Sequence, residues 1–242
     1  PVRESALFHE DEVQAPRGSL SDKAGLQSYA WELDYPGVTN INGRQILWAG
    51  STAGPRAVPG TYTVRMYVGD ELVGEEEFEV KKDPRLEQIS QEDLVKQFEL
   101  VQTINAKLDS THKAINKIRS VREELREQMG SLGVDELSKA LRERAQAMMK
   151  AMTEIEEELV QTKAEATQDV LNFPIRLNNK LAALKSTVAT GYGRPTAQQY
   201  AVYEDLAVKT DVHLTRLQKI WNGEYTDILE EFENPVMPIN ND

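Results

Sequence analysis

Histidine is the residue type that would most directly indicate metal binding or acid–base chemistry, and the chain has three: His9, His112 and His213. Asp109 precedes His112 by three positions, a spacing that places both side chains on one face of a helix, where both could reach one metal ion. A dinuclear metal site in a helical bundle needs two Glu-x-x-His elements and two further carboxylates. The chain has no Glu-x-x-His element. We therefore expect solvated or packed histidines, no metal site and no cofactor.

Aromatic side chains form a second group that could bind a ligand, by stacking on sugar rings; they are Trp31, Tyr35, Trp48, Tyr62 and Tyr67. Trp31 and Tyr62 lie on apolar period-two alternations, so we expect both to face inward, as aromatic residues commonly do in small cores. Tyr67 has the opposite phase from Tyr62. Tyr35, Trp48 and Tyr67 therefore remain the candidate residues for contact with a carbohydrate or peptide ligand.

Acidic runs could supply paired catalytic carboxylates or calcium ligands, and they occur at 75–77, 156–158 and 230–231. Consecutive residues of a helix point in different directions, so such a run does not converge on one ion. No calcium loop, glycine-rich phosphate loop, serine nucleophile elbow or zinc motif is present. The sequence therefore predicts no catalytic, cofactor-binding or metal-binding residue.

The elements that must position these side chains begin with a β-rich region. Residues 29–35 alternate with period two, residues 46–48 form a short apolar run, and residues 62–68 and 76–80 alternate again on either side of a turn. Short strands at this spacing predict a small immunoglobulin-like β-sandwich.

A helical region follows Pro84. Ser90 with Asp93, and Thr196 with Gln199, predict helix N-termini. Apolar residues at helical spacing predict helices from Leu94 to Met129, 137–159, 177–188 and 200–221, the last continuing to Phe232. Long helices with short loops predict an antiparallel up-and-down bundle.

The predicted fold class is thus a multi-domain α+β protein. We expect an extended lead-in at 1–26, a sandwich at 27–84, a helical bundle at 85–234 and an extended tail at 235–242. The chain begins at Pro1 without a methionine, so we expect a processed product or a fragment, with any targeting segment upstream.

Composition excludes several partners. The chain has 28 Lys and Arg residues against 40 Asp and Glu residues, a formal net charge of −12. Such a surface repels phosphate backbones, so nucleic acids and anionic membranes are not expected as partners. No apolar run reaches the ~20 residues that a membrane-spanning helix needs. The absence of cysteine excludes disulfides and thiolate sites but does not fix the compartment.

A set of motifs over residues 28–232 resembles a known family. The motifs are Trp31-x-Leu33-x-Tyr35-Pro36, Gly54-Pro55-x-Ala57-x-Pro59-Gly60-Thr61-Tyr62-x-Val64, Phe78-x-Val80-x-x-Asp83-Pro84-Arg85, Asp93-Leu94 with Gln97-Phe98, Ala114-Ile115-x-x-Ile118-Arg119, and Gly191-x-Gly193-x-Pro195-Thr196-x-Gln198-Gln199-Tyr200. In this order they resemble the C-terminal region of exported bacterial proteins with sortilin-like, BNR-repeat β-propellers, often labelled glycosyl hydrolases.

The resemblance implies a propeller N-terminal to this region, which would carry any hydrolytic or binding site. The blade signature Ser-x-Asp-x-Gly-x-x-Trp is absent from the chain, so no catalytic residue is carried over. The resemblance also implies an exported location: periplasmic, outer-membrane-associated or secreted.

Three functions remain to be distinguished. The leading expectation is a non-catalytic accessory region that docks on the propeller or another protein, or assembles into an oligomer. The first alternative is a carbohydrate- or peptide-binding β-sandwich. The second is a part of a glycosyl hydrolase whose active site lies in the propeller.

Overall fold

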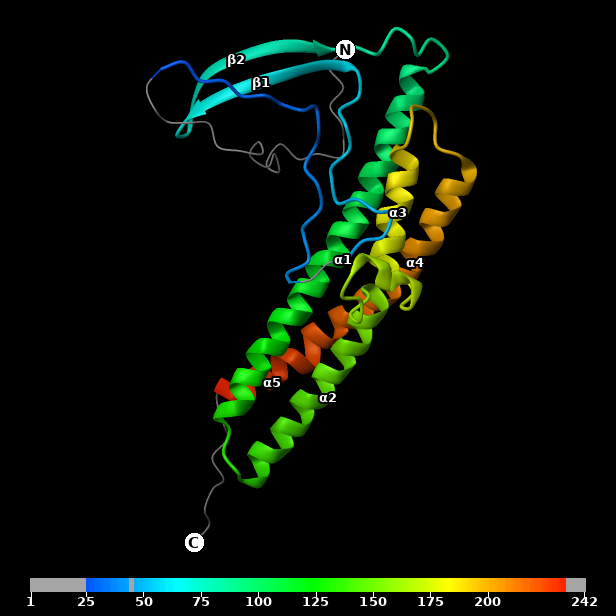
Figure 1. The fold of residues 1–242 in the computed structure, drawn as a ribbon. Coiled ribbons are helices and arrows are strands. Elements are labelled where there is room, and N and C mark those ends of the chain that lie inside the picture. Colours follow the sequence, from blue (N-terminus) through cyan, green and yellow to red (C-terminus); the bar gives the residue numbers. More distant parts are fainter. Residues whose placement is uncertain (1–24, 44–45, 234–242) are drawn as a thin grey trace.

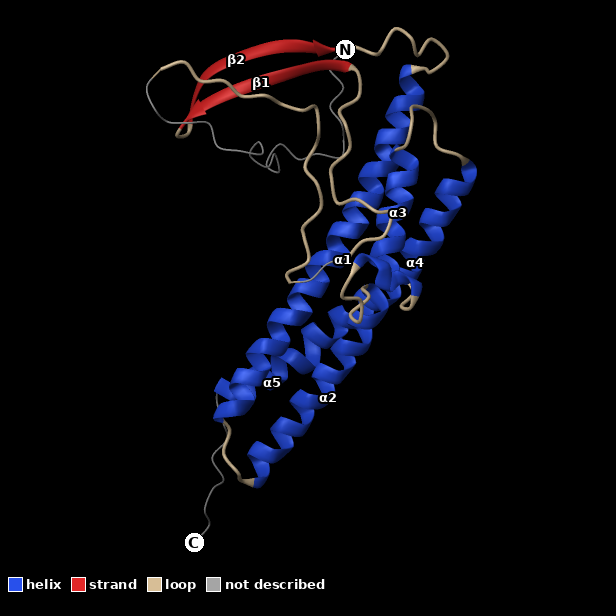
Figure 2. Ribbon diagram, viewed as in Figure 1, coloured by secondary structure: helices blue, strands red, loops and turns tan. Residues whose placement is uncertain are grey.

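The structure, a computed structural model, describes residues 25–43 and 46–233. It is 58% helical, and its described part contains one two-stranded antiparallel sheet. Figure 2 shows helices packed lengthwise into an elongated bundle, with the two strands at one end. The lead-in expected at 1–26 lies almost wholly outside the described residues, as do His9 and the tail at 235–242.

Helix α1 (Gln91–Ser131) is the longest element and runs the length of the bundle (Figure 1). It begins as the sequence predicts, because the Ser90 side chain accepts a hydrogen bond from the Asp93 N–H while the Asp93 carboxylate accepts one from the Ser90 N–H. It ends where Leu132 adopts an extended conformation.

The other predicted helices are also confirmed. They are α2 (Glu136–Leu159), α3 (Leu177–Ala189), α4 (Ala197–Ile220) and α5 (Thr226–Glu233). A 3-10 turn, η2 (Thr167–Leu171), lies between α2 and α3. A π-helical turn, η3 (Trp221–Tyr225), joins α4 to α5, so the last helix has the expected extent but a locally wider turn. Figure 1 shows α2 and α3 along different halves of α1.

The core of the bundle consists of the apolar stripes of these helices. The largest fully buried side chains are Ile104, Leu108, Ile115, Ile118, Leu125, Met148, Met152, Ile155, Leu159, Leu181, Leu217 and Ile228. All five helices contribute to it, so the bundle has one contiguous hydrophobic core.

The sheet is a hairpin of β1 (Gly60–Val68) and β2 (Glu71–Val80). Gly69 in the connecting turn has a φ of +60°, a conformation that glycine adopts without a steric penalty. Tyr62 lies opposite Phe78, and a register shift occurs between Met66 and Tyr67.

The immunoglobulin-like β-sandwich predicted for 27–84 is wrong. Among the described residues, the segments 29–35 and 46–48 form no strand, and only an isolated bridge joins Asp34 to Arg56. Leu33 interrupts the alternation with a φ of +63°. Without a second sheet, the β1 residues expected to face a core are exposed, as Val64 (54%) shows.

The segment 29–35 instead lies beside the hairpin, where Trp31 packs against Tyr62 and Phe78, and the chain that follows it lies on the bundle. Residues 38–43 and 46–53, here called the docked segment, run down α1 and return along α3 (Figure 1). Three backbone hydrogen bonds tie the incoming chain to the outgoing chain. They run from Tyr35 N to the Pro55 carbonyl (2.8 Å), from Val38 N to the Thr52 carbonyl (2.9 Å) and from Ala57 N to the Leu33 carbonyl (2.6 Å). Val38 and Ile41 are buried in the core of the bundle.

Candidate functional site: a clamp for extended backbone

A stripe of polar side chains on α1 faces the docked segment. Asp109, His112, Asn116 and Arg119 are spaced by three, four and three residues, so they lie along one side of the helix. These four residues, together with Asn179 and Lys185 of α3, are here called the clamp. Every clamp side chain binds a main-chain atom of the docked segment, as the distances below establish.

The α1 half of the clamp holds residues 39–42. The Asp109 carboxylate accepts the Thr39 N–H (2.7 Å), and His112 Nδ1 lies 2.7 Å from the Thr39 carbonyl oxygen. Asn116 accepts the Asn42 N–H (2.7 Å) and donates to the Asn40 carbonyl (2.9 Å). Arg119 donates to the Asn42 carbonyl. This side of α1 thus satisfies five main-chain groups between Thr39 and Asn42 that a loop would otherwise leave to water.

The α3 half of the clamp holds residues 48–53. Asn179 accepts the Trp48 N–H (2.7 Å) and donates to the Trp48 carbonyl (2.6 Å), so one amide side chain pairs with both main-chain groups as a neighbouring strand would. The Lys185 ammonium donates to the Ala53 carbonyl (2.6 Å). Gly50 permits this approach, because a Cβ at this position would lie 2.6 Å from the Ala182 Cβ.

Burial lowers the pKa of two clamp side chains. His112 is fully buried, and this burial lowers the pKa of its imidazole below the ordinary value of 6.5. A carbonyl oxygen only accepts hydrogen bonds, so the neutral ring carries its proton on Nδ1, and the buried Nε2 has no hydrogen-bond partner. Burial also lowers the pKa of Lys185 to about 8.

The clamp ends in a buried ion-pair network. Arg119 Nε lies 2.7 Å from one carboxylate oxygen of Glu156, and the Arg122 guanidinium lies 2.5 Å from the other. Arg122 also donates to the Thr153 hydroxyl (2.8 Å). The Glu156 side chain is 3% exposed, so α2 presents a buried charge that both arginines of α1 neutralise.

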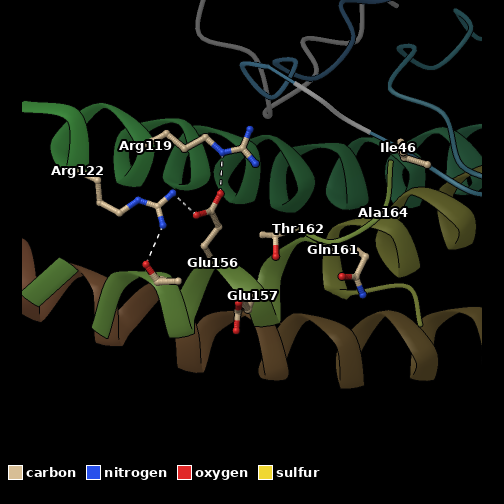
Figure 3. A pocket seen from close by; sticks show the side chains of 9 residues that line it. Ile46, Arg119, Arg122, Glu156, Glu157, Gln161, Thr162 and Ala164 are labelled. Atoms are coloured by element: carbon tan, nitrogen blue, oxygen red, sulfur yellow. Dashed lines mark hydrogen bonds and ion pairs between the residues drawn. The ribbon is translucent and has the colours of Figure 1, made fainter. Parts of the chain in front are cut away.

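A pocket of about 280 Å³ opens beside this network (Figure 3). Figure 3 shows Arg119 and Arg122 converging on Glu156, with Thr162 and Gln161 from the chain after α2 at the other end. Ile46 of the docked segment completes the wall. Two arginines and two glutamates, Glu156 and Glu157, line the pocket, so its formal charges balance. Its polar groups serve to join α1, α2 and the docked segment.

Asp109 and His112, the pair whose spacing could have served a metal, therefore bind peptide backbone. No group of three or more His, Asp or Glu residues suited to a metal occurs within 25–43 and 46–233. Each clamp side chain forms hydrogen bonds with main-chain carbonyl oxygens or N–H groups of the docked segment. The polar contacts are all to main-chain atoms, whereas the buried side chains of Val38 and Ile41 and the absence of a side chain at Gly50 fit this particular segment to the bundle.

The structure places the three candidate ligand-contact aromatics on three different elements. Tyr35 is half-buried and packs edge-on against Phe98 of α1 (4.9 Å between ring centroids), and burial raises the pKa of its hydroxyl. Trp48 is 44% exposed on the docked segment, and Tyr67 is 56% exposed on β1. They do not form a single stacking platform.

Trp31 and Tyr62, which were expected to face inward in the sandwich, are half-buried and contact each other. The Trp31 ring packs edge-on against Tyr62 (5.5 Å) and Phe78 (5.9 Å). This small cluster fixes the base of the hairpin to the chain that precedes the docked segment. The remaining clamp residues were not predicted from the sequence, because α3 also contains Asn178, Lys180, Ser186 and Thr187, and nothing in the sequence distinguishes Asn179 and Lys185 from these.

Comparison of the chain with protein-family models, with curated proteins and with solved structures gave no match. The fold and site themselves define a helical bundle that holds an extended segment and carries a β-hairpin at one end. No helix in the described part of the chain is long and apolar enough to span a membrane.

Proposed function

We propose that this chain is a non-catalytic interaction region, in which the bundle is a rigid mount and the hairpin is the element presented to a partner. The observation that supports this most directly is the clamp. It holds the chain that precedes β1 by contacts to main-chain atoms, from α1 at Thr39 and from α3 at Ala53. A flexible linker would need no such contacts, whereas an element that must be held in a fixed position does.

The resemblance described above suggests the setting. The parent protein would be an exported bacterial protein with a β-propeller, and the partner would be that propeller or a separate protein. Any hydrolytic activity of the parent would belong to the propeller under this proposal.

Chemical cross-linking of the full-length protein in extracts of its native source tests the proposal. Exposed Lys81 lies directly after β2 and reports on the hairpin, whereas exposed Lys139 and Lys150 of α2 report on the far part of the bundle. We expect cross-links from Lys81 to another domain or protein, and few such cross-links from the two α2 lysines. Cross-links confined within residues 25–233 would contradict a docking role.

Carbohydrate binding is a second candidate, supported by the exposed ring of Trp48. The main chain of this residue is fixed by Asn179, so its ring is presented in a defined place. Glycan-array binding that is lost in Trp48→Ala, with folding retained, would favour this function. Binding that is unchanged in Trp48→Ala would exclude this ring as the contact.

A further inference from the structure

The hairpin has an apolar face that continues beyond its contact with the other described residues. Tyr62, Val64, Met66 and Val68 follow one another at period two on β1, with Phe78 opposite Tyr62. Trp31 covers the Tyr62–Phe78 end. Val64, Met66 and Val68, here called the hairpin face, are 54, 53 and 67% exposed.

An uncovered face of this kind is unusual because a two-stranded hairpin alone is only marginally stable in water. Single exposed apolar residues are ordinary, but a contiguous apolar strip bordered by polar residues is typical of an interaction site. β1 also consists mainly of Thr, Tyr, Val and Met, residues that favour strands and pack well against another layer.

The charge around the hairpin face indicates the chemistry of what covers it. Residues 60–80 contain one basic and six acidic residues, a formal charge of −5. Glu76 lies opposite Val64, and Glu71 lies opposite Val68, so both border the hairpin face. The single basic residue, Arg65, forms an ion pair with Glu75 (2.5 Å). A second copy of the chain, or an anionic membrane, would bring like charges together.

We infer that the hairpin face binds a β-strand of a partner protein whose apolar centre is flanked by Lys or Arg. The inference rests on the proposed docking function and specifies the partner. Apolar side chains of the strand cover Val64 and Met66, and its flanking ammonium or guanidinium groups reach the carboxylates of Glu71 and Glu76. Apolar contact supplies the affinity, and the charges supply the selection and the speed of association.

A pair of synthetic peptides tests this inference with the full chain. The probe is fluorescein-labelled KKTVTVTVKK, and its matched control is EETVTVTVEE, which has the same apolar centre. Fluorescence anisotropy is measured at 50 mM and 500 mM salt. We expect a Kd at least tenfold lower for the lysine peptide at low salt, and a loss of most of that preference at high salt because exposed charges are screened.

A pair of protein variants locates the binding surface. Val64→Lys/Met66→Lys places positive charge on the hairpin face and is expected to weaken binding of the lysine peptide at least tenfold. Val208→Lys/Val212→Lys adds the same charges to equally exposed positions on α4 (66 and 62%) and is expected to retain binding. Circular dichroism and thermal unfolding of both variants establish that each remains folded.

Three results would overturn the inference. The first is equal or undetectable binding of the two peptides. The second is an equal loss of binding in the α4 variant and the hairpin variant. The third is dimerisation by light scattering that Val64→Lys/Met66→Lys abolishes, which would make a second copy the occupant. If the peptides fail while cross-links from Lys81 persist, the docking function stands and the basic strand is rejected as its partner.

Discussion

Asp109 and His112 bind the two main-chain groups of one residue, Thr39. The carboxylate accepts its N–H at 2.7 Å, and the imidazole Nδ1 binds its carbonyl oxygen at 2.7 Å. The two side chains lie one turn apart on α1, while Thr39 lies 70 positions from Asp109 in the sequence. A pair of side chains whose spacing suits a metal ion thus positions the docked segment.

Asp109→Ala should lower the free energy of unfolding by about 1–2 kcal/mol, because the half-buried Thr39 N–H loses its charged acceptor. Urea denaturation measures the change, and hydrogen exchange at Thr39 should become faster. Asp205→Ala is the control, since it removes an exposed ion pair with Lys209 on α4 and should change stability by less than about 0.5 kcal/mol. Equal effects of the two substitutions would contradict a structural role for the Thr39 contact.

His112 should make the protein less stable in acid. Its folded-state pKa is held below 6.5 by burial, so below about pH 6.5 the unfolded chain takes up a proton that the folded chain does not, and stability falls with pH. Nearby Asp109 opposes this lowering of the pKa, and Lys185 adds to it. His112→Asn retains a donor for Thr39 but cannot titrate.

The stability advantage of the wild type over His112→Asn should therefore shrink between pH 7.5 and pH 5, by about 1 kcal/mol per unit of pKa difference. Chemical denaturation of both proteins across this range measures it. An advantage that stays constant would show that His112 does not contribute to the acid response.

Lys185 should produce a pH dependence of the same sign as His112, but in an alkaline window. Its folded-state pKa of about 8 lies below the ordinary 10.5, so between pH 8 and pH 10.5 the unfolded chain holds more protons and stability rises with pH. Lys185→Met removes this rise. The free energy of unfolding, measured at pH 7.5 and pH 10, should increase in the wild type relative to Lys185→Met by an amount on the order of 1 kcal/mol or more. If the difference in unfolding free energy between the two proteins is the same at pH 7.5 and pH 10, the pKa of Lys185 is not lowered in the folded protein.

Glu156→Gln should be among the most destabilising single changes, because it leaves Arg119 and Arg122 without their shared carboxylate. Breaking a buried ion pair in this way costs about 3–5 kcal/mol. Glu154→Gln, two residues earlier, removes only an exposed pair with Arg216 and should cost less than about 1 kcal/mol. Guanidinium denaturation compares the two, and similar midpoints would mean that the network around Glu156 is not stabilising.

Gly54→Ala should disrupt the chain between the docked segment and the hairpin. A Cβ at this position would lie 1.7 Å from the Tyr35 carbonyl oxygen, a backbone atom that has little room to move. Overpacking of this kind costs about 1–3 kcal/mol or more. Gly60→Ala is the matched control, since nothing lies within 4 Å of its Cβ position. Thermal unfolding should separate the two variants clearly.

Local sequence determined the helices and the hairpin. The capping boxes at Ser90 and Thr196 join residues three apart, and the apolar stripes repeat within each helix, so both signals could be recognised without knowledge of the fold. The hairpin was equally local, since its strands are joined by a two-residue turn at Gly69 and Asp70.

Only the tertiary structure decided what residues 39–43 and 46–53, which include Trp48, do. An alternating pattern specifies extended chain, but it does not specify whether another strand or a helix face satisfies the main chain. Here the partners are Asp109, Asn179 and Lys185, which lie 70 to 132 positions away along the chain. Such contacts depend on where α1 and α3 meet in space. For that reason the sequence pattern alone predicted a sandwich, and the structure has the clamp instead.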